Sequence, residues 1–279
     1  MSVKLPQGNI HYRESGEGPP IVFVHGLLVD GRLWRKVTPL LQENFRCIVP
    51  EMPLGSHPEP MNPDADLSPP GLARIVAGFL EALDLEDVTL VANDTGGAIS
   101  QVTAAHHPER IGRLVLTNCD AFENFLPPAF RPMQWAARVP GGLTAMMAGM
   151  RFAPLRRLPN AYGRLIKRDF DGAPTREWVD PFLKSREIRR DTVKVLKGID
   201  PKYTFEAAER LRTFERPAML AWAVEDRFFK LSFAERLANT IQGATLEKID
   251  DSYTFVSEDQ PERLAELIAR FAREPAAVA

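Results

Sequence analysis

The sequence predicts an α/β protein whose mainly parallel central sheet is flanked by helices and carries a helical insertion. Short apolar runs rich in β-branched residues alternate with helical patterns, which favours a parallel sheet. This alternation stops after Asn118 and resumes only at Pro217. With 279 residues, the chain is long enough for one such domain with an insertion.

Six short apolar runs are the predicted strands, because continuous apolar strands are typical of a parallel sheet covered on both faces. They are Ile21–Val24, Phe45–Val49, Val88–Asn93, Leu114–Asn118, Ala218–Ala223 and Ala244–Ile249. Asn9–Arg13 is an additional strand that we expect to be antiparallel. The helices predicted between the strands are Arg32–Gln42, Gly71–Leu83, Gly97–His107, Ser232–Thr240 and Pro261–Arg273.

The long interval between the fourth and fifth of these six strands carries helical patterns and no strand pattern. The helix-like stretches are Met133–Val139, Leu143–Met150, Tyr162–Arg168 and Arg176–Val195. We therefore expect an α/β core formed by 1–121 and 212–279, and a helical cap, or lid, formed by 122–211. We expect the basic residues of the cap on a solvated helix face, with an anion site as the alternative. Met146, Met147 and Met150 are expected in cap packing or in an adaptable pocket wall.

Charge and composition argue against several classes of function. The net charge of −2 gives no overall electrostatic reason to bind nucleic acid or an anionic membrane. No apolar stretch is long enough to span a bilayer, and Met1–Pro6 is too polar for a secretory signal. Cys47 and Cys119 form neither a metal spacing nor a disulfide framework. We expect a cytoplasmic protein with a small-molecule substrate, no metal and no cofactor; the oligomeric state is left open.

A carboxylate stands at the turn between the strand that ends at Asn93 and the helix that follows. Asp94 has the small neighbours Gly96 and Gly97, which permit a tight turn. Sharp strand–turn–helix elbows of this kind present a nucleophile. The amide of Thr95, at the helix N-terminus, would point at the reacting centre. The alternative is that Asp94 only caps the helix.

Two other strand ends carry chemically suggestive residues, and ligands of open parallel sheets bind beyond such ends. His25-Gly26 follows the strand Ile21–Val24 and would let the amide of Leu27 complete an oxyanion hole, while His25 itself is expected to be structural. After the strand Ala218–Ala223, Asp226 is the better candidate for an acid that orients a catalytic imidazole. Glu225 is the weaker candidate, and a solvated acidic turn is the alternative.

Together these motifs resemble those of α/β-hydrolase-fold proteins, in particular the haloalkane dehalogenase and epoxide hydrolase branch that uses an Asp nucleophile. The resemblance covers nearly the whole chain. In that branch the carboxylate attacks an electrophilic carbon, and a histidine-activated water then hydrolyses the alkyl-enzyme ester. The resemblance implies that Asp94 is the nucleophile, that Leu27 and Thr95 are the oxyanion donors, and that Asp226 is the acid.

The sequence departs from this branch at the catalytic base. The branch has a His-Phe pair after a C-terminal strand, with a proline seven residues after the histidine. Here Thr254 precedes Phe255 and lies seven residues before Pro261, so Thr254 occupies the histidine position. The last histidine of the chain is His107, so no shift of the alignment supplies a base. Threonine cannot accept a proton at neutral pH.

The sequence also departs from both subgroups around the substrate. Thr95 follows the nucleophile position where haloalkane dehalogenases have a tryptophan, and the dehalogenase-like Asn and the epoxide-hydrolase-like Pro are absent after His25-Gly26. Epoxide hydrolases place two lid tyrosines over the epoxide oxygen, a role that Tyr162 and Tyr203 could fill. Further pocket candidates are Trp34, Tyr253 and His57, the last as a substrate contact or a replacement base.

The missing imidazole leaves three outcomes open. Without it, Asp94 and Asp226 would face a shared cavity with no cation between them, so the pKa of Asp226 should rise and the pair should titrate together. We expect an enzyme that acts on a small, largely apolar molecule through Asp94, with Asp226, Glu225 or His57 positioning water. The alternatives are a lyase or isomerase that uses Asp94 as general acid or base, and a catalytically silent binding protein.

Overall fold

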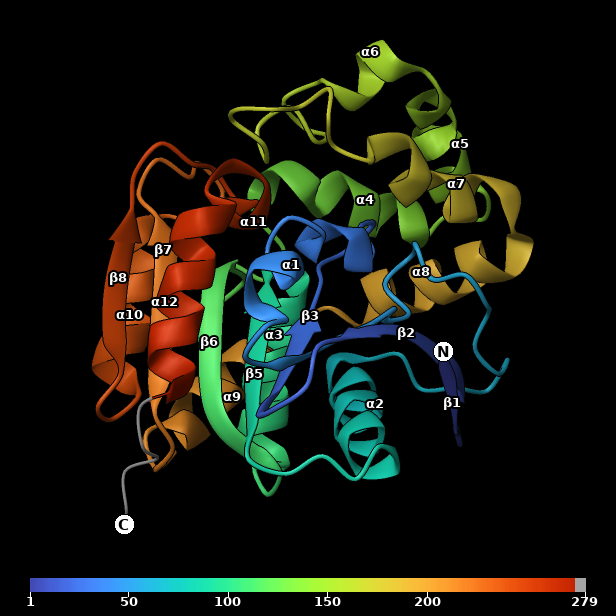
Figure 1. Ribbon diagram of the computed structural model, residues 1–279. Helices are drawn as coiled ribbons and strands as arrows, with labels where there is room; N and C mark the ends of the chain where they lie inside the picture. Colours follow the sequence, from blue (N-terminus) through green and yellow to red (C-terminus); the bar gives the residue numbers. More distant parts are fainter. Residues whose placement is uncertain (274–279) are drawn as a thin grey trace.

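Eight strands form a single mixed sheet in the computed structural model, which describes residues 1–273 (Figure 1). The strands are β1 (Ser2–Leu5), β2 (Gly8–Ser15), β3 (Pro20–Val24), β4 (Arg46–Pro50), β5 (Val88–Asn93), β6 (Ile111–Cys119), β7 (Ala218–Ala223) and β8 (Thr245–Ile249). Their order is β1-β2-β4-β3-β5-β6-β7-β8. The pairs β1–β2 and β2–β4 are antiparallel, and all other pairs are parallel. The predicted mainly parallel sheet is confirmed.

The strand register aligns the carboxyl ends of β3, β5 and β6 at one edge of the sheet. Val24 of β3 lies opposite Ala92 of β5, which in turn lies opposite Leu116 of β6. All residues of β5, β6 and β7 are buried, as their apolar sequences predict. The strand order reverses between β3 and β5, and such a switch point is where α/β sheets bind ligands. The loops after β3 and β5 therefore meet at this edge.

The helices of the core fall into two groups. The core helices are α1 (Thr38–Leu41), α2 (Pro69–Ala82), α3 (Asp94–His106), α9 (Pro201–Leu211), α10 (Leu231–Thr240), α11 (Val256–Asp259) and α12 (Pro261–Arg273). α2 contacts α3, α3 contacts α9 and α9 contacts α10, whereas α1 contacts α12. The predicted helix Arg32–Gln42 consists of the 3₁₀ turn η1 (Gly31–Trp34) and α1. Pro39 lacks the N–H that a continuous helix would need there.

Five short helices lie over the carboxyl ends of the parallel strands (Figure 1). They are α4 (Arg131–Ala137), α5 (Gly142–Met147), α6 (Ala153–Arg156), α7 (Thr175–Lys184) and α8 (Arg186–Gly198), with the 3₁₀ turns η2 (Pro128–Phe130) and η3 (Ala148–Arg151). The predicted helix Arg176–Val195 is broken at Ser185, whose hydroxyl accepts the Ile188 amide and starts α8. None of the described helices is long and apolar enough to cross a membrane.

Two features of the predicted cap differ in the structure. The stretch Tyr162–Arg168 is not helical, because the amides of Lys167 and Arg168 donate to the carboxylate of Asp259 instead of to carbonyls one turn earlier. α9 lies in the interval predicted as cap but packs against α3 and α10 beside the sheet. This packing favours a cap that ends near Gly198, before α9, and the division into core and cap otherwise stays a prediction.

Candidate active site

Asp94 forms a strained elbow between β5 and α3. Its φ of 54° lies in the left-handed region, which non-glycine residues rarely adopt. The turn is possible because glycines surround it: a Cβ on Gly26 would lie 2.1 Å from Asp94 Oδ2, and a Cβ on Gly96 would lie 2.3 Å from the His25 carbonyl oxygen. The cap residue of α3 is Asn93, not Asp94. The Asp94 side chain is thus free of a helix-capping role.

Two backbone amides hold the Asp94 carboxylate. The amide of Leu27, in the loop after β3, donates to Oδ2 at 3.1 Å, and the amide of Thr95 acts on the same carboxylate. Burial, and to a smaller extent the charge of Asp226, raises the pKa of Asp94 to about 7 even though both amides lower it. Near neutral pH, the protonated and the ionised forms of Asp94 are therefore both populated.

Asp94 opens into a covered cavity of about 250 Å³ between the sheet edge and the cap. The part of its surface that stays accessible faces this cavity. Apolar side chains form most of the wall, and those from the cap include Met133, Met146, Met147, Met150, Leu155 and Leu158. The three methionines predicted for a pocket wall thus line the cavity. No lysine, arginine or histidine is among the lining residues of the described chain.

Asp226 follows β7; it does not line the cavity, but its charge acts on Asp94. Its Oδ1 accepts the amides of Phe228 at 2.7 Å and of Phe229 at 3.2 Å. Its Oδ2 is buried and has no hydrogen-bond partner among the described residues. Burial raises the pKa of Asp226 to about 6, although the two amides lower it. This is the direction that the sequence predicted for an acid without its imidazole.

Thr254 occupies a fixed and fully buried position at the same site. Asn93, the last residue of β5, donates from Nδ2 to the Thr254 carbonyl oxygen at 2.9 Å and so anchors this loop to the elbow. The Thr254 hydroxyl lies close enough to Asp226 to lower the pKa of that carboxyl, yet the hydroxyl makes no hydrogen bond of normal geometry within residues 1–273. Thr254 therefore stands next to the acid, where the sequence pattern expects an imidazole.

A third buried carboxyl belongs to this group and was missed in the sequence. Asp120 follows β6 directly, is fully buried, and accepts the Thr95 hydroxyl on Oδ2 at 3.2 Å. Burial and the nearby Asp94 raise the pKa of Asp120 well above its usual range. Its position after the strand next to β5 was the available signal, because parallel strands end at the same edge.

The two histidines predicted near the pocket are held elsewhere. His25 Nε2 accepts the Met52 amide at 2.9 Å, and its Nδ1 donates to the Gly26 carbonyl at 2.9 Å. Burial lowers the pKa of His25, so the ring is neutral and structural. His57 is buried against Asp191, with 3.4 Å between Nε2 and Oδ2, and does not line the cavity. The structure pairs His57 with Asp191 and does not bring it to Asp94, so a role for His57 as replacement base stays a prediction.

Of the aromatic candidates, only Tyr162 reaches the cavity. Its hydroxyl is buried and donates to the Leu28 carbonyl at 2.5 Å. Tyr203 lies at a separate apolar cluster with Ala73 and Val102, so the structure does not bring Tyr162 and Tyr203 together over one site. Trp34 is buried against Phe23. None of these other aromatic side chains lines the cavity within the described residues.

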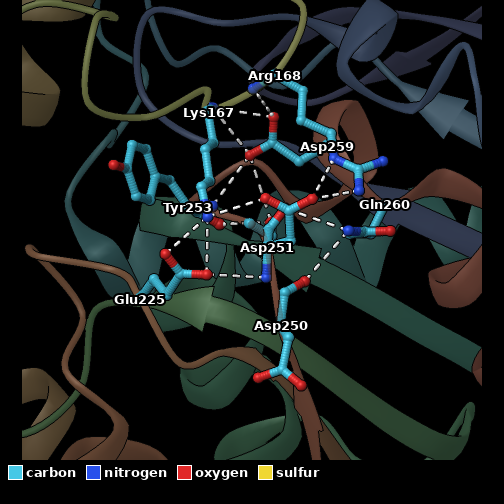
Figure 2. A network of polar contacts seen from close by, with 9 residues as sticks. Lys167, Arg168, Glu225, Asp250, Asp251, Tyr253, Asp259 and Gln260 are labelled. Atoms are coloured by element: carbon cyan, nitrogen blue, oxygen red, sulfur yellow. Dashed lines mark hydrogen bonds and ion pairs between the residues drawn. The ribbon is translucent and has the colours of Figure 1, made fainter.

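Glu225 and Tyr253 belong to a polar network outside the cavity (Figure 2). Lys167 Nζ contacts the Glu225 carboxylate at 2.7–2.8 Å and Asp251 at 2.9 Å, and it lies over the Tyr253 ring. The amides of Lys167 and Tyr253 donate to the buried carboxylate of Asp259 at 2.9–3.0 Å. This network fixes the segment after Tyr162 beside the loop that carries Thr254.

Comparison with known proteins gives the same fold. The family model for the alpha/beta hydrolase fold matches residues 19–261. "Haloalkane dehalogenase 2" of Mycobacterium tuberculosis is 27% identical over 278 residues, which is 95% of this chain and 92% of that protein. A "cis-3-alkyl-4-alkyloxetan-2-one decarboxylase" of Shewanella oneidensis is 26% identical over 280 residues, or 95% of this chain and 85% of that protein.

Solved structures support the fold as well. A reconstructed ancestral haloalkane dehalogenase superposes with a TM-score of 0.79 at 22% identity, covering 98% of both chains. A thermophilic esterase from Thermogutta terrifontis gives a TM-score of 0.77 at 20% identity, with 98% of both chains covered. These relationships support an enzyme of the hydrolase type. The chain belongs to the α/β-hydrolase-fold family.

Proposed function

We propose that the protein is an α/β-hydrolase-type enzyme in which the carboxylate of Asp94 attacks an electrophilic carbon of a small, largely apolar molecule. One observation carries this proposal: a carboxylate held by the Leu27 amide opens into an apolar, covered cavity. The carboxylate oxygen would form an alkyl ester with the substrate carbon, and the leaving group would depart with the bonding electrons. The amides of Leu27 and Thr95 would then stabilise the oxyanion formed when water attacks the ester.

The second half-reaction needs a base, and Asp226 is the candidate that the geometry favours. Glu225 is exposed and bound to Lys167, and His57 lies against Asp191 away from the cavity. Asp226 does not line the cavity either, but its charge acts on Asp94, and its Oδ2 has no hydrogen-bond partner among residues 1–273. A carboxylate with a pKa of about 6 is a weak base without a neighbouring imidazole. We therefore expect the ester to form faster than it is hydrolysed.

A panel of short haloalkanes, epoxides, esters and dialkyl oxetanones tests this function. The names of the relatives motivate the first and the last class. We expect slow turnover or a stable adduct with at least one class, and loss of both in Asp94→Asn. Asp94→Asn keeps the shape of the side chain and removes the nucleophilic charge. Saturable binding without turnover or adduct would instead favour a catalytically silent binding protein.

A second function is acid–base chemistry at Asp94 without a covalent intermediate, as in a lyase, an isomerase or a decarboxylase. The observation that favours it is the pKa of Asp94, which is about 7 and suits proton transfer near neutral pH. Multiple turnovers in H₂¹⁸O separate the two routes. Hydrolysis of an Asp94 ester at its acyl carbon would leave ¹⁸O in the Asp94 carboxylate, whereas acid–base chemistry would leave the carboxylate unlabelled.

A further inference from the structure

The outer part of the cap is basic, although the net charge of the whole chain is −2. Between residues 124 and 168 there is no Asp or Glu. The same stretch holds eight basic residues: Arg131, Arg138, Arg151, Arg156, Arg157, Arg164, Lys167 and Arg168. Four exposed arginines of this stretch make no ion pair among the described residues: Arg131, Arg138, Arg151 and Arg164. This part of the surface is therefore strongly cationic.

The same part of the cap exposes large apolar side chains. These are Trp135, Val139, Met146, Phe152, Leu155 and Leu158, which together with the four free arginines we call the cap face. They come from α4 to α6 and the adjoining turns, where α4 contacts α5 and both α5 and α6 contact η3. In Figure 1, α6 is the element farthest above the sheet. Apolar exposure of this extent marks an interaction surface.

The cap face is continuous with the cavity above Asp94. Met146, Leu155 and Leu158 are exposed by 46%, 39% and 44% on the outside and also line the cavity. The other side of the cap is fixed to the core, where the Leu165 carbonyl accepts the Phe255 amide and Lys167 contacts Asp251. An apolar molecule would therefore reach Asp94 through the cap face.

We propose that the cap face docks on the surface of an anionic lipid bilayer, from which the apolar substrate enters the cavity. Arginine guanidinium groups bind phosphate in a fork geometry, and tryptophan favours the boundary between headgroups and acyl chains. A second copy of the chain is disfavoured as the occupant, because a two-fold interface would bring these unpaired arginines together. The part of this inference that concerns the substrate rests on the proposed function, whereas docking itself does not.

Tryptophan emission and vesicle flotation test the docking. Trp135 is 62% exposed, whereas Trp34, Trp178 and Trp222 are buried, so a blue shift on adding vesicles reports mainly on the cap face. We expect binding and a blue shift with vesicles of phosphatidylcholine containing about a third phosphatidylglycerol, weakening with salt. Arg151→Gln/Arg164→Gln should weaken the binding about 25-fold, since each arginine near an anionic surface contributes about fivefold.

Matched variants make the result specific to the cap face. Arg74→Gln/Arg212→Gln removes two exposed arginines of the core and should leave binding unchanged. Phe152→Asp should weaken binding, whereas Leu40→Asp, at a similarly exposed position on α1, should not. Asp94→Asn should bind vesicles like the unaltered protein, so that loss of chemistry and loss of docking are distinguishable. Binding indifferent to lipid charge, equal effects of the paired variants, or self-association through the cap face would overturn the proposal.

Discussion

At the scale of single residues, the site is defined by what surrounds Asp94. Three carboxyl groups follow the neighbouring strands β5, β6 and β7: Asp94, which is partly buried, and Asp120 and Asp226, which are buried. No cationic side chain of the described residues lines the cavity into which Asp94 opens. Since like charges and burial both disfavour ionisation, the cluster holds protons that isolated carboxyl groups would lose at neutral pH.

The first prediction concerns the pH dependence of ester formation. Only the carboxylate form of Asp94 is nucleophilic, so the rate of alkylation should rise with pH and level off above its pKa of about 7. Asp226→Asn should move this midpoint to lower pH, because the charge of Asp226 raises the pKa of Asp94. Asp120→Asn is the control and should barely move it, because Asp120 does not contribute to the raised pKa of Asp94. Equal shifts in both variants would contradict these charge assignments.

A second prediction concerns the missing base. Thr254→His should raise the rate at which the Asp94 ester is hydrolysed, because position 254 adjoins Asp226, which would orient the imidazole. Thr254→Val, which matches threonine in shape and supplies no base, should give no such gain. The measurement is single-turnover decay of the adduct, with circular dichroism to show that both variants fold. A folded Thr254→His variant with unchanged decay would contradict the inferred geometry.

At the scale of elements, the cap is attached to the core through a buried carboxylate. Asp259 of α11 accepts the amides of Lys167, Arg168 and Tyr253, so it joins the cap segment to the loop of Thr254. The outer ion pairs of the same network are exposed (Figure 2). Exposed pairs contribute little to stability, whereas hydrogen bonds to a buried charge contribute more.

The third prediction separates these two parts of the network. Asp259→Asn places an amide N–H₂ toward backbone donors and should cost about 2 kcal/mol or more of unfolding free energy. It should also speed hydrogen exchange at the amides of Lys167 and Tyr253. Glu225→Gln, in the exposed part, should change neither quantity appreciably. Similar destabilisation in both variants, measured by denaturant unfolding, would refute the role given to the buried carboxylate.

At the scale of the whole molecule, the buried acids link stability to pH. The pKa values of Asp94 and Asp226 are about 7 and 6 in the folded chain, compared with 3.8 for an unperturbed aspartate. Their contribution to stability is therefore complete below about pH 4 and is lost as pH rises through 6 and 7.

A fourth prediction follows from this linkage. Asp94→Asn should have the same melting temperature as the unaltered protein near pH 4 and a higher one at pH 8, by about 2 °C or more. Exposed Asp64→Asn is the control and should show no such divergence. Thermal scans across this pH range give the comparison. A difference in melting temperature that shrinks as pH rises would contradict the proposed link between Asp94 and stability.

The sequence predicted what depends on local pattern. The apolar strand before Asp94 and the small residues after it predicted the elbow, and His25-Gly26 predicted the position of the Leu27 amide. Asp226 and Thr254 were placed together by motif spacing, and the structure brings them into one buried group. These residues come together because the parallel sheet aligns the carboxyl ends of its strands.

What depends on distant contacts could not be predicted. The residues around Lys167 are not helical because their amide partner, Asp259, lies 92 residues away. Tyr203 was assigned to the cap, but α9 packs on α3 and carries it away from the cavity. The cap face also became visible only once exposed and lining side chains could be compared.

The most direct test of the central claim is the mass of the peptide that contains Asp94 after incubation with a short 1-bromoalkane. We predict that this peptide gains the mass of the alkyl group minus one hydrogen, that the adduct persists for longer than it takes to form, and that Asp94→Asn gains nothing. Rapid release of bromide from a protein whose Asp94 peptide never carries the label, or a label that is equally abundant in Asp94→Asn, would contradict it.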